Sequence, residues 1–348
     1  MNKQRLQQKR QLVNLIREFF TNQGFFEMET PLLVPSPGME VHLHGFKTEY
    51  INPQGEMESY YLPTSPEFAL KKALGAGFQN VFEISRVFRN HGELGHLHHP
   101  EFNMLEWYRP GSYIQIMDDV ETLLDYLVRH VDTVPLFGSE YWTKSIKRTS
   151  IKDCFYNYAE MDLEAGLVDL KLWRQTAAKA LAEKIPQDDS FEDIFFRIWL
   201  KLIEPQLGEN RPEIVFDYPA SMAALAKLKA PENIWAERFE LYIRGIEIGN
   251  AFSELTDSEE QEKRFQDANG ERAILGYPPH PVDTEFIEAV GKMPPTGGIA
   301  IGVERLLMAL TGESDIRQFF LYPVPDARRK KKEKDDFDPN EPSTTFPS

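Results

Sequence analysis

Two glutamates in the segment 239–255 have the spacing of a paired-carboxylate site. Arg244 and Gly245 predict a two-residue turn, which places Glu240 diagonally across from Glu247 on one face of a hairpin. Two carboxylates among apolar residues repel each other unless a cation lies between them. Carboxylate oxygens suit a Mg²⁺ ion that carries substrate phosphates, so both glutamates are candidate metal ligands. The spacing alone leaves open the alternative of solvated glutamates on an edge hairpin.

Two arginines are placed where they could hold phosphate. Arg89 ends a predicted strand over residues 81–89, and a guanidinium can bind phosphate through two hydrogen bonds. Gly302 and Arg305 lie in the first turn of a predicted helix over residues 302–311, and helix N-termini attract anions. Taken singly, each arginine is explained equally well as a surface residue.

Four histidines, His91, His96, His98 and His99, share the polar segment 90–100. Their spacing matches no standard zinc-binding set. We therefore expect a solvated loop, or a loop that contacts a phosphate or a base, rather than a metal site.

Further polar groups could bind an amine. Ser65 and Glu67 precede a helical run, where they are either a helix cap or ligands of an ammonium group. Glu106 and Tyr108 share one face of a predicted strand, and Glu254 is a third spare carboxylate. Together with the two arginines and the paired glutamates, these residues suit an enzyme that activates a cationic amino acid with ATP.

The elements that must position these residues follow from hydrophobic periodicity. The first is a helix of about 18 residues that stops near Gly24, followed by strands at 81–89 and 101–108. Residues 112–210 are predicted to be mostly helical, with a capping box at Ser190 and Asp193. Strands at 237–255 and 297–301 and a helix at 302–311 follow. This order predicts an α+β fold, with an antiparallel sheet flanked by helices and a helical insertion at about 133–210.

Composition limits the protein class. The 348 residues carry a net charge of −16 and one cysteine, which excludes a disulfide framework and a cysteine zinc site and disfavours a broad duplex-binding surface. No apolar stretch is long enough to span a membrane and no secretory signal is visible, so we expect a cytoplasmic protein. Residues 1–325 are expected to form the folded domain, and the charged tail 326–348 to be disordered.

Four stretches of the chain resemble the catalytic domain of class II aminoacyl-tRNA synthetases, lysyl branch, and the resemblance spans about residues 6–325. GFFEMETPLLVPSPG is similar to motif 1, FEISRVFRNHGELGHLHHPEFNMLEWYR to motif 2 and GGIAIGVERLLMAL to motif 3. FELYIRGIEIGNAFSELTDSEEQEKRF is similar to the lysyl-type segment between motifs 2 and 3. TSPE and Ala300 narrow the resemblance to the ligases that attach (R)-β-lysine to elongation factor P, in which an alanine at that position favours β-lysine over α-lysine. The stretch before Pro31 is too short for an anticodon-binding domain, so we expect no tRNA substrate.

The resemblance implies a role for individual residues. Arg89 and Arg305 are expected to be catalytic, contacting the α- and γ-phosphates of ATP, and Glu240 and Glu247 to hold Mg²⁺. Other residues expected to bind ATP are His91, Glu93, His98, His99, Phe102, Glu247, Ile248 and Gly302. Residues expected to bind the amino acid are Ser65, Glu67, Glu106, Tyr108, Asn250, Glu254 and Ala300.

The resemblance also implies partners and leaves alternatives. Motif 1 implies a homodimer, and the expected partners are ATP, β-lysine or lysine, and elongation factor P. The motif 2 loop departs from the family pattern, because His96 and His99 replace an arginine and an asparagine, and His91 stands close to where an adenine-reading glutamate is expected. An α-lysine-activating enzyme with another acceptor and a catalytically inactive binding module are the alternative interpretations.

Overall fold

The structure, a computed structural model, describes residues 2–92, 95–131 and 138–324. Eight strands form one sheet in the order β1-β4-β5-β10-β9-β8-β7-β6. Neighbouring strands are antiparallel except at the two ends, where β1 pairs with β4 and β6 with β7 in parallel. The expected antiparallel sheet of an α+β fold is therefore confirmed. The strands are β1 (Phe26–Glu27), β4 (Val81–Phe88), β5 (Glu101–Pro110), β6 (Lys147–Ser150), β7 (Glu213–Pro219), β8 (Trp235–Ile243), β9 (Ile246–Ser253) and β10 (Thr296–Gly302).

The two faces of this sheet differ because side chains alternate along each strand. On β5, Leu105 and Trp107 are fully buried in the main hydrophobic core. Glu106 and Tyr108 point to the opposite face, and Ala300 of β10 pairs with Glu106 in the ladder. One face is thus packed against apolar helices, while the other presents polar side chains at its centre.

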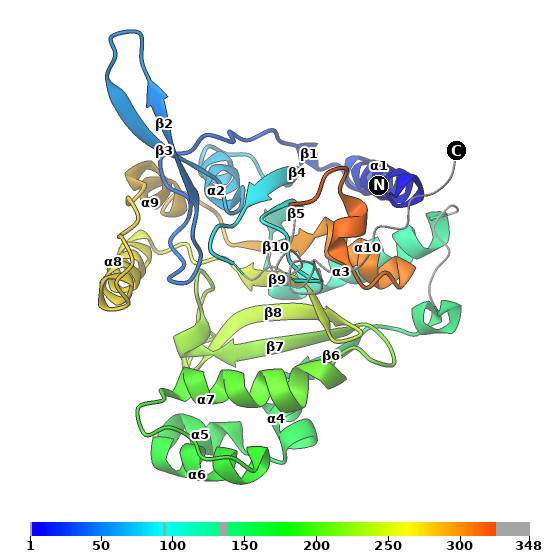
Figure 1. Cartoon of the computed structure of the whole chain (residues 1–348), viewed down its shortest axis with the longest axis vertical. Helices are drawn as coiled ribbons and strands as arrows, with labels where there is room; N and C mark the ends of the chain where they lie inside the picture. The colour runs from blue at the N-terminus through cyan, green and yellow to red at the C-terminus, as the bar shows by residue number, and fades with distance from the viewer. Residues whose placement is uncertain (1, 93–94, 132–137, 325–348) are drawn as a thin grey trace, which may run out of the picture.

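Helices cover both faces (Figure 1). α1, α3 and α10 supply the apolar core, and α2, α8 and α9 pack together over the opposite face. The helix predicted before Gly24 is confirmed as α1, and the helix predicted at 302–311 is confirmed as α10. The bounds are α1 (Lys3–Asn22), α2 (Glu67–Gly75), α3 (Tyr113–His130), α8 (Ser258–Ile274), α9 (Thr284–Val290) and α10 (Val303–Thr311).

Four helices that lie between β6 and β7 in the sequence form a separate layer at the lower end of Figure 1. They pack around their own cluster of buried side chains, including Phe155, Trp173 and Phe195. The last of them begins at Ser190 with the predicted capping box and continues as a π-helix over Trp199–Ile203. β6 falls within the region that the sequence predicted to be helical, because a four-residue edge strand leaves little periodicity. The helices are α4 (Ile151–Ala159), α5 (Leu163–Val168), α6 (Leu170–Leu181) and α7 (Phe191–Ile198).

The hairpin of β8 and β9 has the predicted turn and register. Arg244 and Gly245 both have positive φ, at 53° and 69°, and Tyr242 pairs with Glu247. A bulge beside Tyr242 shifts the register, so that Asn250 pairs with Glu240. The bulge therefore brings Asn250 to the polar face together with both glutamates.

A second hairpin, β2 (Phe46–Ile51) with β3 (Met57–Leu62), projects away from the body of the molecule (Figure 1). β3 leads directly into the segment that carries Ser65. Across residues 2–92, 95–131 and 138–324, we find no helix with the length and apolar character needed to cross a membrane. The tail predicted at 326–348 lies outside the described residues.

Candidate active site

A group of buried polar residues lies on the polar face of the sheet, beneath α2. This group, the carboxylate cluster, consists of Glu67 and Lys71 from α2, Glu106 and Tyr108 from β5, and Glu254 directly after β9. All but Glu67 are at most 3 % exposed. The structure therefore brings together four of the residues expected to bind the amino acid, and adds a lysine to them.

Lys71 lies at the centre of the cluster. Its Nζ is 2.5 Å from Glu67 Oε1 and 2.6 Å from Glu254 Oε2. Burial lowers the pKa of Lys71, but the charges of Glu254 and Glu67 outweigh it, so that the pKa is raised. The lysine is therefore a permanent cation that compensates part of the negative charge around it.

Glu106 is held in the cluster by two hydrogen bonds. Ser65 Oγ donates a hydrogen bond of 2.6 Å to Glu106 Oε1, and the Tyr108 hydroxyl donates one of 3.0 Å to Oε2. Burial raises the pKa of Glu106 to about 8, and the charge of Glu67 adds to this effect. Burial likewise raises the pKa of Glu254 to about 7, against the opposing charge of Lys71. Both carboxyls thus titrate near neutral pH.

Glycine on β10 leaves room beside the cluster. A Cβ at Gly298 would lie 2.3 Å from the Tyr108 ring and 2.6 Å from Glu254 Oε1. That oxygen is buried and has no hydrogen-bond partner among the described residues. The cluster therefore offers one unused acceptor, as a site for an incoming ammonium group would.

A cavity of about 740 Å³, the arginine cavity, lies next to the cluster on the same face. Arg89 and Arg305 both line it, and the Arg89 guanidinium lies 5.3 Å from the centre of the Phe102 ring. Arg89 Nε is buried without a hydrogen-bond partner among the described residues, which leaves a donor for a ligand. The other predicted residues that line the cavity are His91, His98, His99, Glu247, Ile248, Asn250, Ala300 and Gly302.

Arg305 is held in place by backbone and side-chain contacts. Its Nη1 donates to the backbone oxygen of Glu247 at 2.9 Å and lies 3.5 Å from the Oε2 atom of the same residue. Its Nη2 is 2.8 Å from His98 Nε2, and its Nε donates to the backbone oxygen of Leu97. The arginine thus links the first turn of α10 to β9 and to the loop between β4 and β5.

The paired glutamates have unequal surroundings. Glu240 Oε2 accepts hydrogen bonds from the hydroxyls of Tyr218 and Tyr242, and Oε1 lies 2.6 Å from Arg238 Nη2. Among residues 2–92, 95–131 and 138–324, Glu247 has only the longer side-chain contact with Arg305, and burial together with the Glu240 charge raises its pKa. Within the described residues, no group of three or more acidic, histidine or cysteine side chains is arranged to hold a metal. These donors fit a Mg²⁺ ion that also takes oxygen ligands from a substrate.

The four histidines of the loop do not converge on one point. His99 is buried, stacks on Phe320 at 4.1 Å, and its ring nitrogens contact the backbone of Glu101 and Val324. His91 packs edge-on against His44 instead. Glu93, expected to contact ATP, lies outside the described residues.

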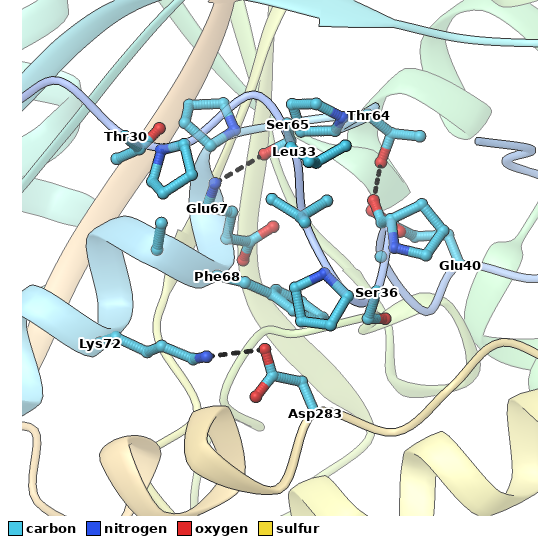
Figure 2. Close-up of a pocket in the computed structure, with 18 residues that line it drawn as sticks. Thr30, Leu33, Ser36, Glu40, Thr64, Ser65, Glu67, Phe68, Lys72 and Asp283 are labelled. Atoms are coloured by element: carbon cyan, nitrogen blue, oxygen red, sulfur yellow. Dashed lines mark hydrogen bonds and ion pairs between the residues drawn. The ribbon is translucent and has the colours of Figure 1, made fainter. Parts of the chain in front are cut away.

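A smaller cavity of about 230 Å³ lies on the other side of Ser65 and Glu67 (Figure 2). Prolines of the segment 30–38 and Phe68 form its walls, and the ion pair of Lys72 with Asp283, at 2.8 Å, closes one end. Glu40 lines both this cavity and the arginine cavity.

Sequence reasoning missed three charged residues of this region: Lys71, Arg238 and Glu40. Lys71 follows Glu67 by four residues on a helix, which is the spacing of an ion pair and could have indicated it. Arg238 precedes Glu240 by two residues on one strand and so shares its face. For Glu40 no such local signal exists, because its place depends on the fold of an irregular segment.

Comparison with known proteins agrees with this geometry. The sequence model of the class II tRNA synthetases (D, K and N) matches residues 1–326. The elongation factor P–(R)-β-lysine ligase of Hamiltonella defensa subsp. Acyrthosiphon pisum is 34% identical over 318 residues, covering 90% of this chain and 93% of that protein. The enzyme of the same name from Yersinia enterocolitica is 35% identical over 314 residues, covering 89% and 91%. The chain therefore belongs to the class II tRNA synthetase family and, within it, to the family of the elongation factor P–(R)-β-lysine ligases.

Proposed function

We propose that this protein is an ATP-dependent ligase that activates (R)-β-lysine as an adenylate and transfers it to a lysine ε-amine of elongation factor P. The observation that carries the proposal is a buried carboxylate cluster placed directly beside an arginine-lined cavity. The carboxylate cluster fits a cationic amino acid, and the arginine cavity fits a nucleoside triphosphate. The names and coverage of the two relatives support the same assignment.

The charge of the cluster suits a substrate with two ammonium groups. Glu67, Glu106 and Glu254 carry three negative charges when ionised, and Lys71 carries one positive charge. The remainder of two negative charges matches the two amino groups of lysine or β-lysine. Buried charges must be paired, so an amino acid with a neutral side chain would leave a carboxylate uncompensated. We assign Glu254 and Tyr108 to the side-chain amine.

Adenylation needs positioning and charge neutralisation rather than a base. The amino-acid carboxylate is already a nucleophile, and it attacks the α-phosphorus while pyrophosphate leaves in line. Arg89 is assigned to the α-phosphate and Arg305 to the γ-phosphate, as the resemblance to class II synthetases implies, and both arginines line the arginine cavity. Glu240 and Glu247 would hold Mg²⁺, which neutralises phosphate charge when it is bound.

Ala300 is assigned to the choice between lysine isomers. It pairs with Asn250 on one side and with Glu106 on the other, so it lies between the arginine cavity and the carboxylate cluster. A single methyl group at this place changes the space for the substrate backbone and biases selection without forbidding either isomer.

The assembly and location of the protein complete the proposal. We propose a homodimer formed through the motif 1 region, where Phe26 and Leu32 are large apolar side chains exposed to solvent and the exposed Phe78 packs against Phe26. We also propose a cytoplasmic location and no tRNA substrate.

Intact-mass measurement of elongation factor P from the same organism tests the function. The factor is incubated with this protein, ATP and Mg²⁺, and with either (R)-β-lysine or α-lysine. We expect a mass gain of one lysyl group that appears faster with the β isomer. Pyrophosphate exchange without any mass gain would indicate an α-lysine-activating enzyme with another acceptor. Absence of exchange with both isomers would indicate an inactive binding module.

A further inference from the structure

The second step of the proposed reaction requires a proton acceptor. A lysine side chain has a pKa near 10.4, so the acceptor arrives as an ammonium ion without a free electron pair. Most carboxylates of the site are already engaged. Glu67 and Glu254 are paired with Lys71, and Glu106 accepts hydrogen bonds from Ser65 and Tyr108. These three carboxylates already have partners in the cluster, and the amino-acid substrate is assigned to them.

Glu40 is the exception. Its carboxylate has no hydrogen bond or ion pair with another side chain of the described chain, and it lines both cavities of the site. Its conformation depends on Gly38, where a Cβ would lie 2.9 Å from Glu40 Oε2 and 3.0 Å from Thr64 Oγ1. Gly38 also has a φ of +135°, which side-chain-bearing residues rarely adopt. Glycine at position 38 therefore leaves the space that the Glu40 carboxylate occupies.

The smaller cavity has a volume and a lining that suit a lysine side chain (Figure 2). Its volume of about 230 Å³ is below the roughly 300–1,000 Å³ of typical small-molecule sites, so it suits one extended side chain. Its proline and phenylalanine walls suit the methylene stem of a lysine. Glu40 and Glu67 supply negative charge for the ammonium end.

The surroundings of Glu40 favour its protonated form more than water does. Burial raises the pKa of Glu40, and the charge of Glu67 on α2 raises it further. Arg89 and the backbone amides of Met39 and Glu40 itself act in the opposite direction. A general base is most effective when its pKa lies close to the working pH, which a raised carboxyl pKa approaches.

We propose that Glu40 is the general base of the transfer step, and that the acceptor lysine reaches it through the smaller cavity. This inference rests on the proposed function. The Glu40 carboxylate takes one proton from the acceptor ammonium, and the freed electron pair forms a bond to the adenylate carbonyl carbon. The bond from that carbon to the phosphate oxygen breaks, and AMP leaves with the electron pair. The second nitrogen proton passes to water, and Glu40 returns its own proton to solvent.

The test is Glu40→Gln, compared with the wild type and with Glu49→Gln, which makes the same charge change at an exposed position of β2. Three rates are measured: pyrophosphate exchange with (R)-β-lysine, single-turnover transfer to elongation factor P, and hydroxamate formation with hydroxylamine. Hydroxylamine is uncharged at neutral pH and needs no base. We expect the ratio of protein transfer to exchange to fall about 10²- to 10⁴-fold, with hydroxamate formation following exchange.

Several results would overturn the inference. Protein transfer that falls no more than exchange would show that Glu40 takes no proton, and a raised KM for (R)-β-lysine would place it in the amino-acid pocket. Absence of exchange in the wild type would instead contradict the proposed function.

A second variant covers the case in which Glu40→Gln fails to fold. Ala69→Leu fills the smaller cavity from α2 without changing charge. It should impair transfer to elongation factor P while sparing hydroxylamine, which is small. Wild-type protein transfer in Ala69→Leu would exclude this route for the acceptor.

Discussion

The carboxylate cluster and the arginine cavity lie side by side but differ in how completely their charges are paired. In the cluster, Lys71 joins two carboxylates and Glu106 has two donors. In the cavity, Arg89 has a buried nitrogen without a partner among the described residues, and Arg305 is held mainly by backbone oxygens. The charges of the carboxylate cluster are thus largely paired without a ligand, whereas those of the arginine cavity are not. Under the proposed function, the amino-acid site is therefore formed before substrate binds, whereas the nucleotide site gains its balancing charge from ATP.

The strongest way to break the arginine cavity is Arg89→Ala. We expect pyrophosphate exchange to fall by at least about 10³-fold, because no other described side chain replaces the charge at the α-phosphate. The free energy of unfolding should change little, since the guanidinium has an unsatisfied nitrogen in the absence of ligand. Arg86→Ala, three residues earlier on β4 and paired with Glu101 at the surface, is the matched control and should keep exchange. Near-normal exchange in the Arg89 variant would refute its role.

The carboxylate cluster is broken by Lys71→Met. The change leaves Glu67 and Glu254 close together without a cation, so we expect a loss of about 3–5 kcal/mol in the free energy of unfolding. Urea denaturation at neutral pH measures this loss. Lys263→Met removes an exposed i,i+4 ion pair with Asp267 and should cost at most about 0.5 kcal/mol. Equal losses in the two variants would show that the cluster is not held by Lys71.

The pH dependence of substrate binding separates the two regions further. Glu106 has a pKa of about 8 without ligand, so its carboxylate is largely ionised above pH 8 and neutral below it. An ammonium group binds the ionised form, and we expect the KM for (R)-β-lysine to rise about tenfold from pH 8.5 to pH 7. Pyrophosphate exchange at varied amino-acid concentration measures it. In Glu106→Gln the KM should be higher at every pH and nearly independent of pH. If the KM of this variant still changed with pH as in the wild type, the titrating group would be Glu254 instead.

A smaller effect is expected at the boundary of the two regions. Ala300→Gly should shift the ratio of kcat/KM values from (R)-β-lysine toward α-lysine by about fivefold, or about 1 kcal/mol. Parallel exchange assays with the two isomers measure the ratio. An unchanged ratio would mean that this methyl group does not select the isomer.

The smallest effect is expected in the loop of the arginine cavity. His91→Glu supplies a carboxylate close to where the family pattern has one, and we expect the KM for ATP to fall by about threefold through one added hydrogen bond. The KM for (R)-β-lysine should stay constant, since His91 lines only the arginine cavity among the two cavities described. A simultaneous change in both values would show that the two regions are coupled.

Local patterns in the sequence determined much of this protein. The turn at Arg244 and Gly245, the pairing of Tyr242 with Glu247, and the capping box at Ser190 were all predicted and confirmed. These features depend on residues that are near each other in the chain, where dihedral preferences and alternation decide the geometry. The family motifs likewise indicated most residues that the structure gathers at the site.

Only the tertiary structure decided how these residues are paired. The sequence showed spare carboxylates, but the position of Lys71 between Glu67 and Glu254 depends on α2 packing over the end of β9. Glu40 reaches both cavities because an irregular proline-rich segment folds back beside Ser65, and no periodicity describes such a path. Electrostatic pairing acts through space between segments far apart in sequence, so charges visible in the chain acquire their roles only when the fold brings them into contact.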